Sequence, residues 1–163
     1  MGPCSDRIGV RIEGHWAPRM RMGSPTLFER IAHGDLPSHP VARGEGWYAF
    51  LDVFPRRPGH TLVVPERGVP RLADLSPDER GALMDGVAEA QRRLSQVFDT
   101  KDFLVLVHDG VGAGQEVPHV HVHVIPRTSG DGGRSLPALW PEAKGERADD
   151  ASLAAWSQNL VNS

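Results

Sequence analysis

Cysteine is almost absent from this sequence, since Cys4 is the one cysteine among 163 residues. A lone thiol cannot close a disulfide within the chain, which excludes the class of small disulfide-linked folds. Long apolar runs are absent as well, and none approaches the roughly 20 residues that a helix needs to cross a bilayer. The fold must depend on a hydrophobic core, which a chain of about 160 residues can form by burying close to 70% of its unfolded surface.

An excess of charge of either sign is also missing. The 18 Lys and Arg residues nearly balance the 21 Asp and Glu residues, which leaves a formal net charge of −3. This balance argues against a protein that coats nucleic acid or an anionic membrane, so a small-molecule partner is expected. The first 25 residues lack the apolar core of a secretory signal, and a cytoplasmic protein is predicted.

Composition and periodicity divide the sequence into three parts. Residues 1–25, with scattered Gly, Pro and Arg, are expected to form a flexible N-terminal arm. Residues 26–127 carry the strand and helix signals of a single domain. Residues 128–163 begin with a Gly-rich loop and end in a predicted short helix from Asp150 to Val161, which is expected to pack on the domain.

Within the domain, the pattern predicts an antiparallel sheet backed by one long helix, which is an α+β fold. Strand signals at Trp47–Val53 and Thr61–Val64 flank a turn-forming Arg-Arg-Pro-Gly segment and indicate a hairpin. A capping box at Ser76–Glu79 precedes a helix predicted from about Pro77 to Phe98. The apolar run within Lys101–Val107 is typical of a buried strand.

A row of alternating histidines is the most unusual feature of the sequence. His119, His121 and His123 alternate with valines, and alternate residues of a β-strand share one face. With 8 histidines in 163 residues, chance gives this spacing only about 0.02 times per chain if positions are independent. The three imidazoles are therefore expected to face a cleft while the intervening valines enter the core.

A glycine-rich loop, Gly110–Gln115, precedes the row of histidines. Glycine lets the backbone approach a ligand closely, and N–H groups freed in such a loop can point at phosphate oxygens. Gln115 adds a neutral side-chain donor, and neutral imidazoles approach an anionic phosphate without charge repulsion. Phosphoryl chemistry is the favoured interpretation. A metal site with imidazole ligands and a structural role for hydrogen-bonded histidines are the alternatives.

The segment from Gly114 to Arg127, Gly-Gln-Glu-Val-Pro-His-Val-His-Val-His-Val-Ile-Pro-Arg, resembles the signature of the histidine triad (HIT) family of nucleotide hydrolases and transferases. The similarity extends upstream through Ala49–Pro55, Pro58–Pro65 and Asp74–Glu79, so it covers roughly residues 26–127. It implies an enzyme with the HIT fold. The Asp-Gly-x-x-x-Gly-Gln loop is most similar to the fragile histidine triad branch, which hydrolyses dinucleoside polyphosphates such as Ap3A and Ap4A.

The resemblance implies a role for each member of the triad. His121 would be the nucleophile that forms a nucleotidyl-histidine, and His123 would hydrogen-bond the reacting phosphate or the leaving oxygen. His119 would support the row, and Gln115 would contact the transferred phosphoryl group. The residues implied to bind or surround the substrate are Asp52, on the ribose hydroxyls, and His60, His108, Gly114, Glu116 and Val117.

Two of these implied roles compete with simpler ones. A turn-capping carboxylate is the alternative for Asp52. His60 is expected to support the triad rather than to touch the phosphate. His108 replaces the Asn or Gln that relatives commonly carry near the phosphates, so it introduces a titratable group at that position.

The sequence departs from many prokaryotic relatives at a zinc site. Those relatives bind zinc through a Cys-x-x-Cys, a histidine after the second strand and the first triad histidine. Thr26, Glu29 and Gly68 occupy the corresponding positions here, and His119 alone cannot complete a tetrahedral site. We therefore expect no structural zinc and no required cofactor, with Mg²⁺ only as an optional companion of the substrate phosphates.

The resemblance also implies a leaving group and an oligomeric state. A dinucleoside polyphosphate hydrolase that releases AMP is the expected activity. A nucleoside phosphoramidate hydrolase and a nucleotide-binding sensor with slow turnover are the alternatives. Relatives pair through the long helix and a central strand, which implies a homodimer here through Leu83–Phe98 and Phe103–Val107. The apolar run Phe103–Val107 would otherwise be an aggregation hazard as an exposed edge.

Overall fold

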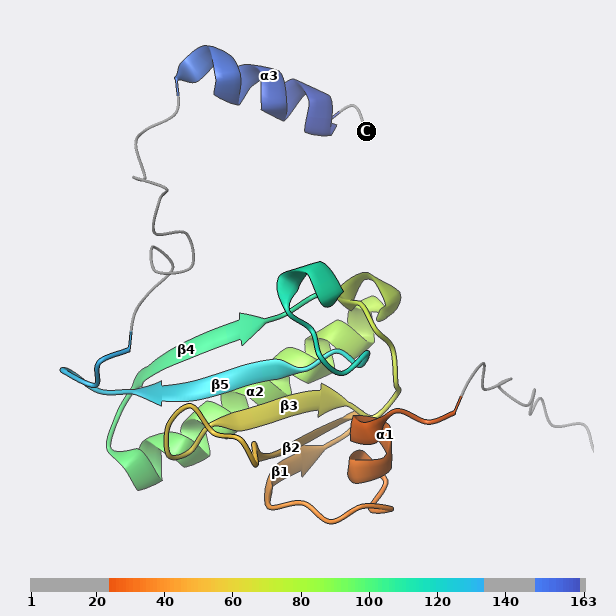
Figure 1. Cartoon of the computed structure of the whole chain (residues 1–163), viewed down its shortest axis with the longest axis vertical. Coiled ribbons are helices and arrows are strands. Elements are labelled where there is room, and N and C mark those ends of the chain that lie inside the picture. The colour runs from red at the N-terminus through yellow and green to blue at the C-terminus, as the bar shows by residue number, and fades with distance from the viewer. Residues whose placement is uncertain (1–23, 134–148, 162–163) are drawn as a thin grey trace, which may run out of the picture.

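One antiparallel sheet of five strands forms the centre of the molecule, with a long helix across one face (Figure 1). The structure is a computed structural model that describes residues 24–133 and 149–161. The strand order is β1-β2-β3-β5-β4, and the predicted α+β fold is confirmed. The strands are β1 (Pro40–Gly44), β2 (Trp47–Leu51), β3 (Thr61–Pro65), β4 (Asp102–Val107) and β5 (Val122–Arg127).

The long helix, α2 (Pro77–Phe98), begins and ends where the sequence predicts. The Ser76 hydroxyl accepts the backbone N–H of Glu79 at 3.2 Å, and the Glu79 carboxylate accepts the backbone N–H of Ser76 at 2.8 Å. This reciprocal pair satisfies two of the N–H groups that a helix start leaves without partners. The buried face of α2 packs on the sheet against the alternate valines of the histidine segment, Val120, Val122 and Val124.

The predicted hairpin is confirmed, because β2 pairs antiparallel with β3 from Trp47 opposite Pro65 to Leu51 opposite Thr61. Strand β5 then pairs with β3, which brings His123 opposite Leu62. The regular strand begins at Val122, so His119 and His121 lie in the segment that leads into it. The valines of this segment are buried as predicted.

Strand β4 differs from its prediction as a buried strand, because it lies at the edge of the sheet and is exposed or only half-buried throughout. Phe103 and Val107 pack against the core beneath the sheet. Leu104 and Leu106 line a cavity on the opposite face. The apolar run therefore places apolar side chains on both faces of an edge strand. In the sequence, such a run looks the same as that of a strand buried on both faces.

Two elements were not predicted, β1 and the helix α1 (Leu27–Ala32). Thr26 caps α1 by accepting the backbone N–H of Glu29, and the Glu29 carboxylate accepts the backbone N–H of Thr26. The T-x-x-E signature of this capping box is visible in the sequence, but six residues are too few for a helical period to show. Two short 3-10 helices, η1 (Leu72–Asp74) and η2 (Val111–Ala113), lie in the connecting loops.

The terminal segments leave two predictions untested. The C-terminal helix α3 (Asp150–Val161) forms with the predicted bounds. Residues 1–23 of the expected N-terminal arm lie outside the described part of the chain, as does the connection at 134–148, so the packing of the C-terminal segment on the domain stays a prediction. Among the described helices, none is both long and apolar enough to cross a membrane.

Candidate active site

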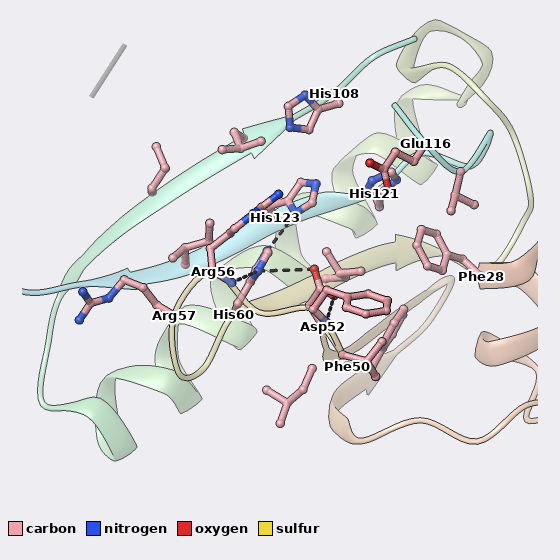
Figure 2. A pocket seen from close by; sticks show the side chains of 18 of the residues that line it. Phe28, Phe50, Asp52, Arg56, Arg57, His60, His108, Glu116, His121 and His123 are labelled. Carbon is pink, nitrogen blue, oxygen red and sulfur yellow. Dashed lines mark hydrogen bonds and ion pairs between the residues drawn. The ribbon is translucent and has the colours of Figure 1, made fainter. Parts of the chain in front are cut away.

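A cavity of about 890 Å³ lies on the face of the sheet opposite α2. Figure 2 shows His121 and His123 along its floor, with Phe28 from α1 near one end and Arg57 near the other. The sheet builds this floor because the residues that alternate with Val63 on β3 and with Val122 and Val124 on β5 must point away from α2. The predicted cleft is therefore present, but only His121 and His123 of the row line it, because His119 is fully buried.

The tautomer of His121 follows from its hydrogen bond to the backbone. Its Nδ1 lies 2.7 Å from the carbonyl oxygen of His119, and a carbonyl can only accept, so the proton sits on Nδ1. The lone pair is then on Nε2, and no hydrogen bond within the described residues engages that atom. The Phe28 ring contacts the imidazole edge-on, with centroids 5.1 Å apart. This geometry presents a neutral nitrogen nucleophile to the cavity.

His119 is fully buried and supports this arrangement from behind. Its Nε2 donates to the Pro65 carbonyl at 2.9 Å, so its Nδ1 accepts the hydrogen bond from the Thr26 hydroxyl at 2.6 Å. The same hydroxyl accepts the N–H of Glu29. The capped start of α1 thereby fixes the ring of His119, whose carbonyl in turn orients His121.

His123 is held by a chain of hydrogen bonds that begins at the backbone. The N–H of Arg56 donates to His60 Nδ1 at 3.2 Å, and His60 Nε2 lies 2.9 Å from His123 Nδ1. Because a backbone N–H can only donate, the proton of neutral His60 is on Nε2, and that of His123 is consequently on its own Nε2. His123 Nε2 is buried and has no hydrogen-bond partner among the residues that the structure describes. It is a hydrogen-bond donor held ready for a ligand.

His60 is the middle member of this hydrogen-bond chain, and its side chain contacts His123 rather than His121. Asp52 adds a carboxylate oxygen 3.5 Å from His60 Nδ1 (Figure 2). Asp52, His60 and His123 offer the one group of potential metal ligands in the described residues, within 4.8 Å of one another. The hydrogen bond between the two imidazoles engages His60 Nε2 and His123 Nδ1.

Burial holds the three triad imidazoles neutral at pH 7. It lowers the pKa of His119 to about 4, against weaker opposing effects of the Pro65 carbonyl and Glu29. It also lowers the pKa of His123 to about 4, reinforced by the neighbouring histidines His121, His60 and His108. The pKa of His121 is lowered for the same first reason, burial. A neutral nucleophile beside a neutral donor is the form that attack on phosphorus requires.

The glycine loop differs in one respect from its prediction. The N–H groups of Ala113, Gly114 and Gln115 are bonded to carbonyls inside the loop, so these three are not free to bind phosphate. Gly110 has φ +113°, and a side chain there would collide with the Arg71 guanidinium. Gly114 has φ +90°. Glycine is needed at both positions for the backbone conformation.

Gln115 is placed deeper than expected. Its amide nitrogen donates to the Pro70 carbonyl at 2.8 Å, the side chain is buried, and the residue does not line the cavity. Its position ties the loop to the segment after β3. A contact between Gln115 and the transferred phosphoryl group stays a prediction.

The other predicted substrate residues line the cavity: Asp52, His60, His108, Gly114, Glu116 and Val117. Asp52 also accepts the backbone N–H of Phe54 at 2.8 Å, so one of its oxygens caps a turn while the residue faces the cavity. His108 Nδ1 lies 2.5 Å from the Ala113 carbonyl, which places the proton there. The His108 imidazole therefore donates from Nδ1 to the loop, and Nε2 is its ring nitrogen that remains for a ligand.

Sequence reasoning missed the apolar end of the cavity and the arginines that line it, Arg56, Arg57 and Arg127. Phe28 and Ile31 come from α1, and Phe50 comes from β2, where its ring lies 5.7 Å from that of Phe28. Arg56 lines the cavity beside His60. The capping box at Thr26 was the available signal for the first two. Nothing in the pattern singled out Arg56 from the neighbouring turn residues.

The positions aligned with the zinc ligands of relatives do come together, but with the wrong donors. A side chain at Gly68 would meet the Glu29 carboxylate at 2.7 Å and the Thr26 methyl group at 3.2 Å. The Thr26 hydroxyl already occupies His119 Nδ1. One hydroxyl, one carboxylate and one imidazole without thiolates do not fit a closed structural zinc site.

We therefore expect protein purified without added metal to contain well under one zinc per chain. Elemental analysis after extensive dialysis is the measurement, and activity should survive treatment with a chelator. A Thr26→Cys, Glu29→Cys variant, which restores the thiolate pair, is the matched control and should retain more zinc. Stoichiometric zinc in the wild-type protein that resists chelation would contradict this account of the positions.

Comparison with known proteins agrees with this geometry. Bis(5'-nucleosyl)-tetraphosphatase (asymmetrical) from Schizosaccharomyces pombe is 48% identical over 83 residues, which are 51% of this chain and 46% of that protein. Bifunctional bis(5'-adenosyl)-triphosphatase/adenylylsulfatase from Arabidopsis thaliana is 39% identical over 84 residues, 52% of this chain and 47% of that protein. The chain thus spans about half the length of these two curated relatives.

A solved structure extends the similarity to the fold. The crystal structure of a HIT family member from Bacillus subtilis matches with a TM-score of 0.73 at 27% identity, covering 85% of this chain and 96% of that one. Residues 33–130, which include all five strands and the three histidines of the row, match the HIT domain. The chain belongs to the HIT domain family.

Proposed function

We propose that the protein hydrolyses dinucleoside polyphosphates at an α-phosphorus through a nucleotidyl intermediate on His121. The observation that carries this proposal is the fixed tautomer of His121, which presents the Nε2 lone pair next to the unpartnered N–H of His123. The names of the yeast and plant relatives support the substrate class. Nothing in this chemistry calls for a resident metal.

In the first step, His121 Nε2 attacks the α-phosphorus. A nitrogen–phosphorus bond forms as the bond to the bridging oxygen breaks, and the leaving nucleotide takes the electron pair. The N–H of His123 is placed to donate to that oxygen as its charge develops. The imidazole of the adduct is cationic, and the His119 carbonyl, which accepts its Nδ1–H, stabilises the positive charge.

In the second step, water attacks the phosphorus from the vacated side. The nitrogen–phosphorus bond breaks, the electron pair returns to Nε2, and the water proton passes to solvent. The released product is a nucleoside monophosphate. A covalent nucleophile is an advantage because it splits one difficult displacement into two easier steps.

The apolar end of the cavity is suited to the transferred nucleoside. Phe28, Ile31 and Phe50 provide aromatic and aliphatic surface for a base. Asp52 lies between these rings and His60, and its carboxylate can accept hydrogen bonds from two ribose hydroxyls. This order supports a binding mode in which the α-phosphorus lies over His121.

A substrate panel tests the proposal. Ap3A, Ap4A and adenosine 5'-phosphoramidate are incubated with the protein, and the products are separated by ion-exchange chromatography. The proposal predicts AMP from Ap3A or Ap4A with a higher kcat/KM than from the phosphoramidate. Faster turnover of the phosphoramidate would instead favour phosphoramidate hydrolysis. Tight AMP binding without turnover of any substrate would indicate a sensor.

The proposal includes a homodimer formed through β4 and α2. Val105 on β4 and Met84 and Val97 on α2 are apolar and 37%, 54% and 74% exposed. An edge strand with exposed apolar residues is a surface that proteins normally cover. Sedimentation velocity at micromolar concentration is expected to show a dimer.

A charged residue on the edge strand provides the control for this prediction. Val105→Lys should shift the protein toward monomer, because lysine discourages edge-to-edge pairing. Val111→Lys, at an exposed residue of η2, should leave the dimer intact. A wild-type protein that sediments only as a monomer would exclude this interface.

A further inference from the structure

The cavity continues past His123, beyond what the transferred nucleotide needs. In the pairing of β4 with β5, Leu106 lies opposite His123 and Leu104 lies opposite Ile125. These three apolar residues line the cavity, so they form a floor that begins at His123. Their face of the sheet is the one that carries the triad, and the floor leads away from Phe28.

The dimensions of this floor suit a nucleoside. Strands rise about 3.3 Å per residue, so the distance along β5 from His123 to Arg127 is roughly 13 Å. The whole cavity measures about 890 Å³, which is near the upper end of the ~300–1,000 Å³ range of ligand pockets. The apolar end at Phe28 and the floor beyond His123 together offer two places for planar groups, one on each side of the catalytic histidines.

Charged groups surround the floor on two sides. Arg57 and Arg127 close its far end, where both contact Asp131, at 3.6 Å and 2.7 Å. Because one carboxylate is shared by two guanidinium groups, these three side chains together carry a net positive charge. Arg56 forms no ion pair within the described residues, and its charge contributes to lowering the pKa of His60, after the larger effect of burial. Cations therefore lie near and beyond His123.

We infer that the floor of Leu104, Leu106 and Ile125, with Arg56 beside it, is a subsite for the leaving nucleotide of a dinucleoside polyphosphate. This inference rests on the proposed function. In an in-line displacement the leaving oxygen departs opposite the attacking nitrogen, so a leaving group on the His123 side enters this subsite. Its phosphates lie by Arg56 and its base lies on the floor. An amine leaving group would not reach it.

A substitution in the floor separates the two kinds of substrate. Leu104 lies on the edge strand and is only half-buried, so the sheet should tolerate the substitution Leu104→Asn. The measurement is kcat/KM for Ap4A and for adenosine 5'-phosphoramidate, which share the transferred nucleotide and differ in the leaving group. The ratio of Ap4A to phosphoramidate should fall about tenfold in Leu104→Asn, because the leaving base loses apolar contact.

The matched control is Ile31→Asn, at the opposite end of the cavity. This substitution touches the transferred nucleoside, which both substrates share, so both values should fall and their ratio should stay within about twofold of wild type. Circular dichroism verifies that each variant is folded. Arg56→Ala should lower the ratio of Ap4A to phosphoramidate more than the corresponding ratio of Ap3A to phosphoramidate, because Ap3A has fewer phosphates.

The outcomes distinguish this inference from the proposed function. If the wild-type protein cleaves Ap4A but Leu104→Asn leaves the ratio unchanged, the subsite is wrong and the proposed function stands. If the wild-type protein cleaves only the phosphoramidate, both are wrong. If Leu104→Asn unfolds, Leu106→Asn and Arg56→Ala decide, and an unchanged ratio in both overturns the subsite.

Discussion

Replacing His121 with asparagine is expected to lower turnover by at least about a thousandfold, the loss seen when enzymes lose a covalent nucleophile. The amide keeps much of the size and polarity of the imidazole but cannot form the nitrogen–phosphorus bond. AMP binding should remain within about threefold of wild type, because His121 contributes chemistry rather than most of the contact area. Single-turnover kinetics and calorimetric AMP titration are the measurements.

His39→Asn is the matched control, since His39 is exposed and does not line the cavity. It should retain wild-type turnover. The same substitution at His123 should have an intermediate effect, because it removes a donor to the leaving oxygen, and at His119 a milder one on the chemical step. If His121→Asn kept more than about a tenth of the activity, a loss of at most ~1.4 kcal/mol in transition-state stabilisation, the nucleophile would be another residue.

Acidification is expected to remove both activity and stability. Attack requires neutral His121, whose pKa is lowered by burial, so activity should be flat near pH 7 and fall about tenfold per pH unit below that pKa. For His119, the pKa is about 4 in the folded protein and about 6.5 when unfolded. Between these values the unfolded chain binds more protons, so the free energy of unfolding falls as the pH falls.

His119 is fully buried, so the difference between its folded and unfolded pKa should make a large contribution to the pH dependence of stability. Between pH 6.5 and 4, this contribution should lower the free energy of unfolding by about 3 kcal/mol. Urea unfolding at pH 7, 5.5 and 4.5 measures it, and His119→Asn should flatten the dependence. A free energy of unfolding that rises on acidification, or activity that peaks near pH 5, would contradict the assigned protonation states.

Local signals made the long helix and the hairpin predictable. Helix α2 has a capping box, a proline in its first turn and 22 residues of helical period, so its bounds follow from the chain itself. The strands β2 and β3 are close in sequence and joined by a turn segment. Such elements depend on residues that are close in sequence, so their patterns can be recognised without knowledge of the fold.

The hydrogen bonds of the site join distant residues, so local patterns do not predict them. The resemblance implied that His60 supports the triad, but not which atom it contacts. His60 meets His123 across 63 residues, because β3 pairs with β5 rather than with β4. Thr26 meets His119 across 93 residues. The sequence analysis treated Thr26 as a missing zinc ligand, whereas in the fold Thr26 is both the cap of α1 and the hydrogen-bond donor that fixes His119.

The glycine loop illustrates a different limit. Glycines at 110 and 114 do mark an unusual backbone, but the pattern does not say which N–H groups the loop consumes internally. The position of Gln115 has the same origin, since its amide is used by the Pro70 carbonyl, 45 residues earlier in the chain. Residue type indicated the chemistry of this region, and the fold decided which atoms are available.

The covalent adduct on His121 is the most direct test of the account. Enzyme in excess over Ap4A is mixed for milliseconds and quenched in alkaline denaturant, because the nitrogen–phosphorus bond of a histidine adduct is labile in acid. Peptide mapping by mass spectrometry should find AMP attached to the peptide that contains His121, with fragmentation placing it on that residue and none in His121→Asn. AMP formed at the full single-turnover rate without any adduct, or an adduct on His119 or His123, would contradict the proposed mechanism.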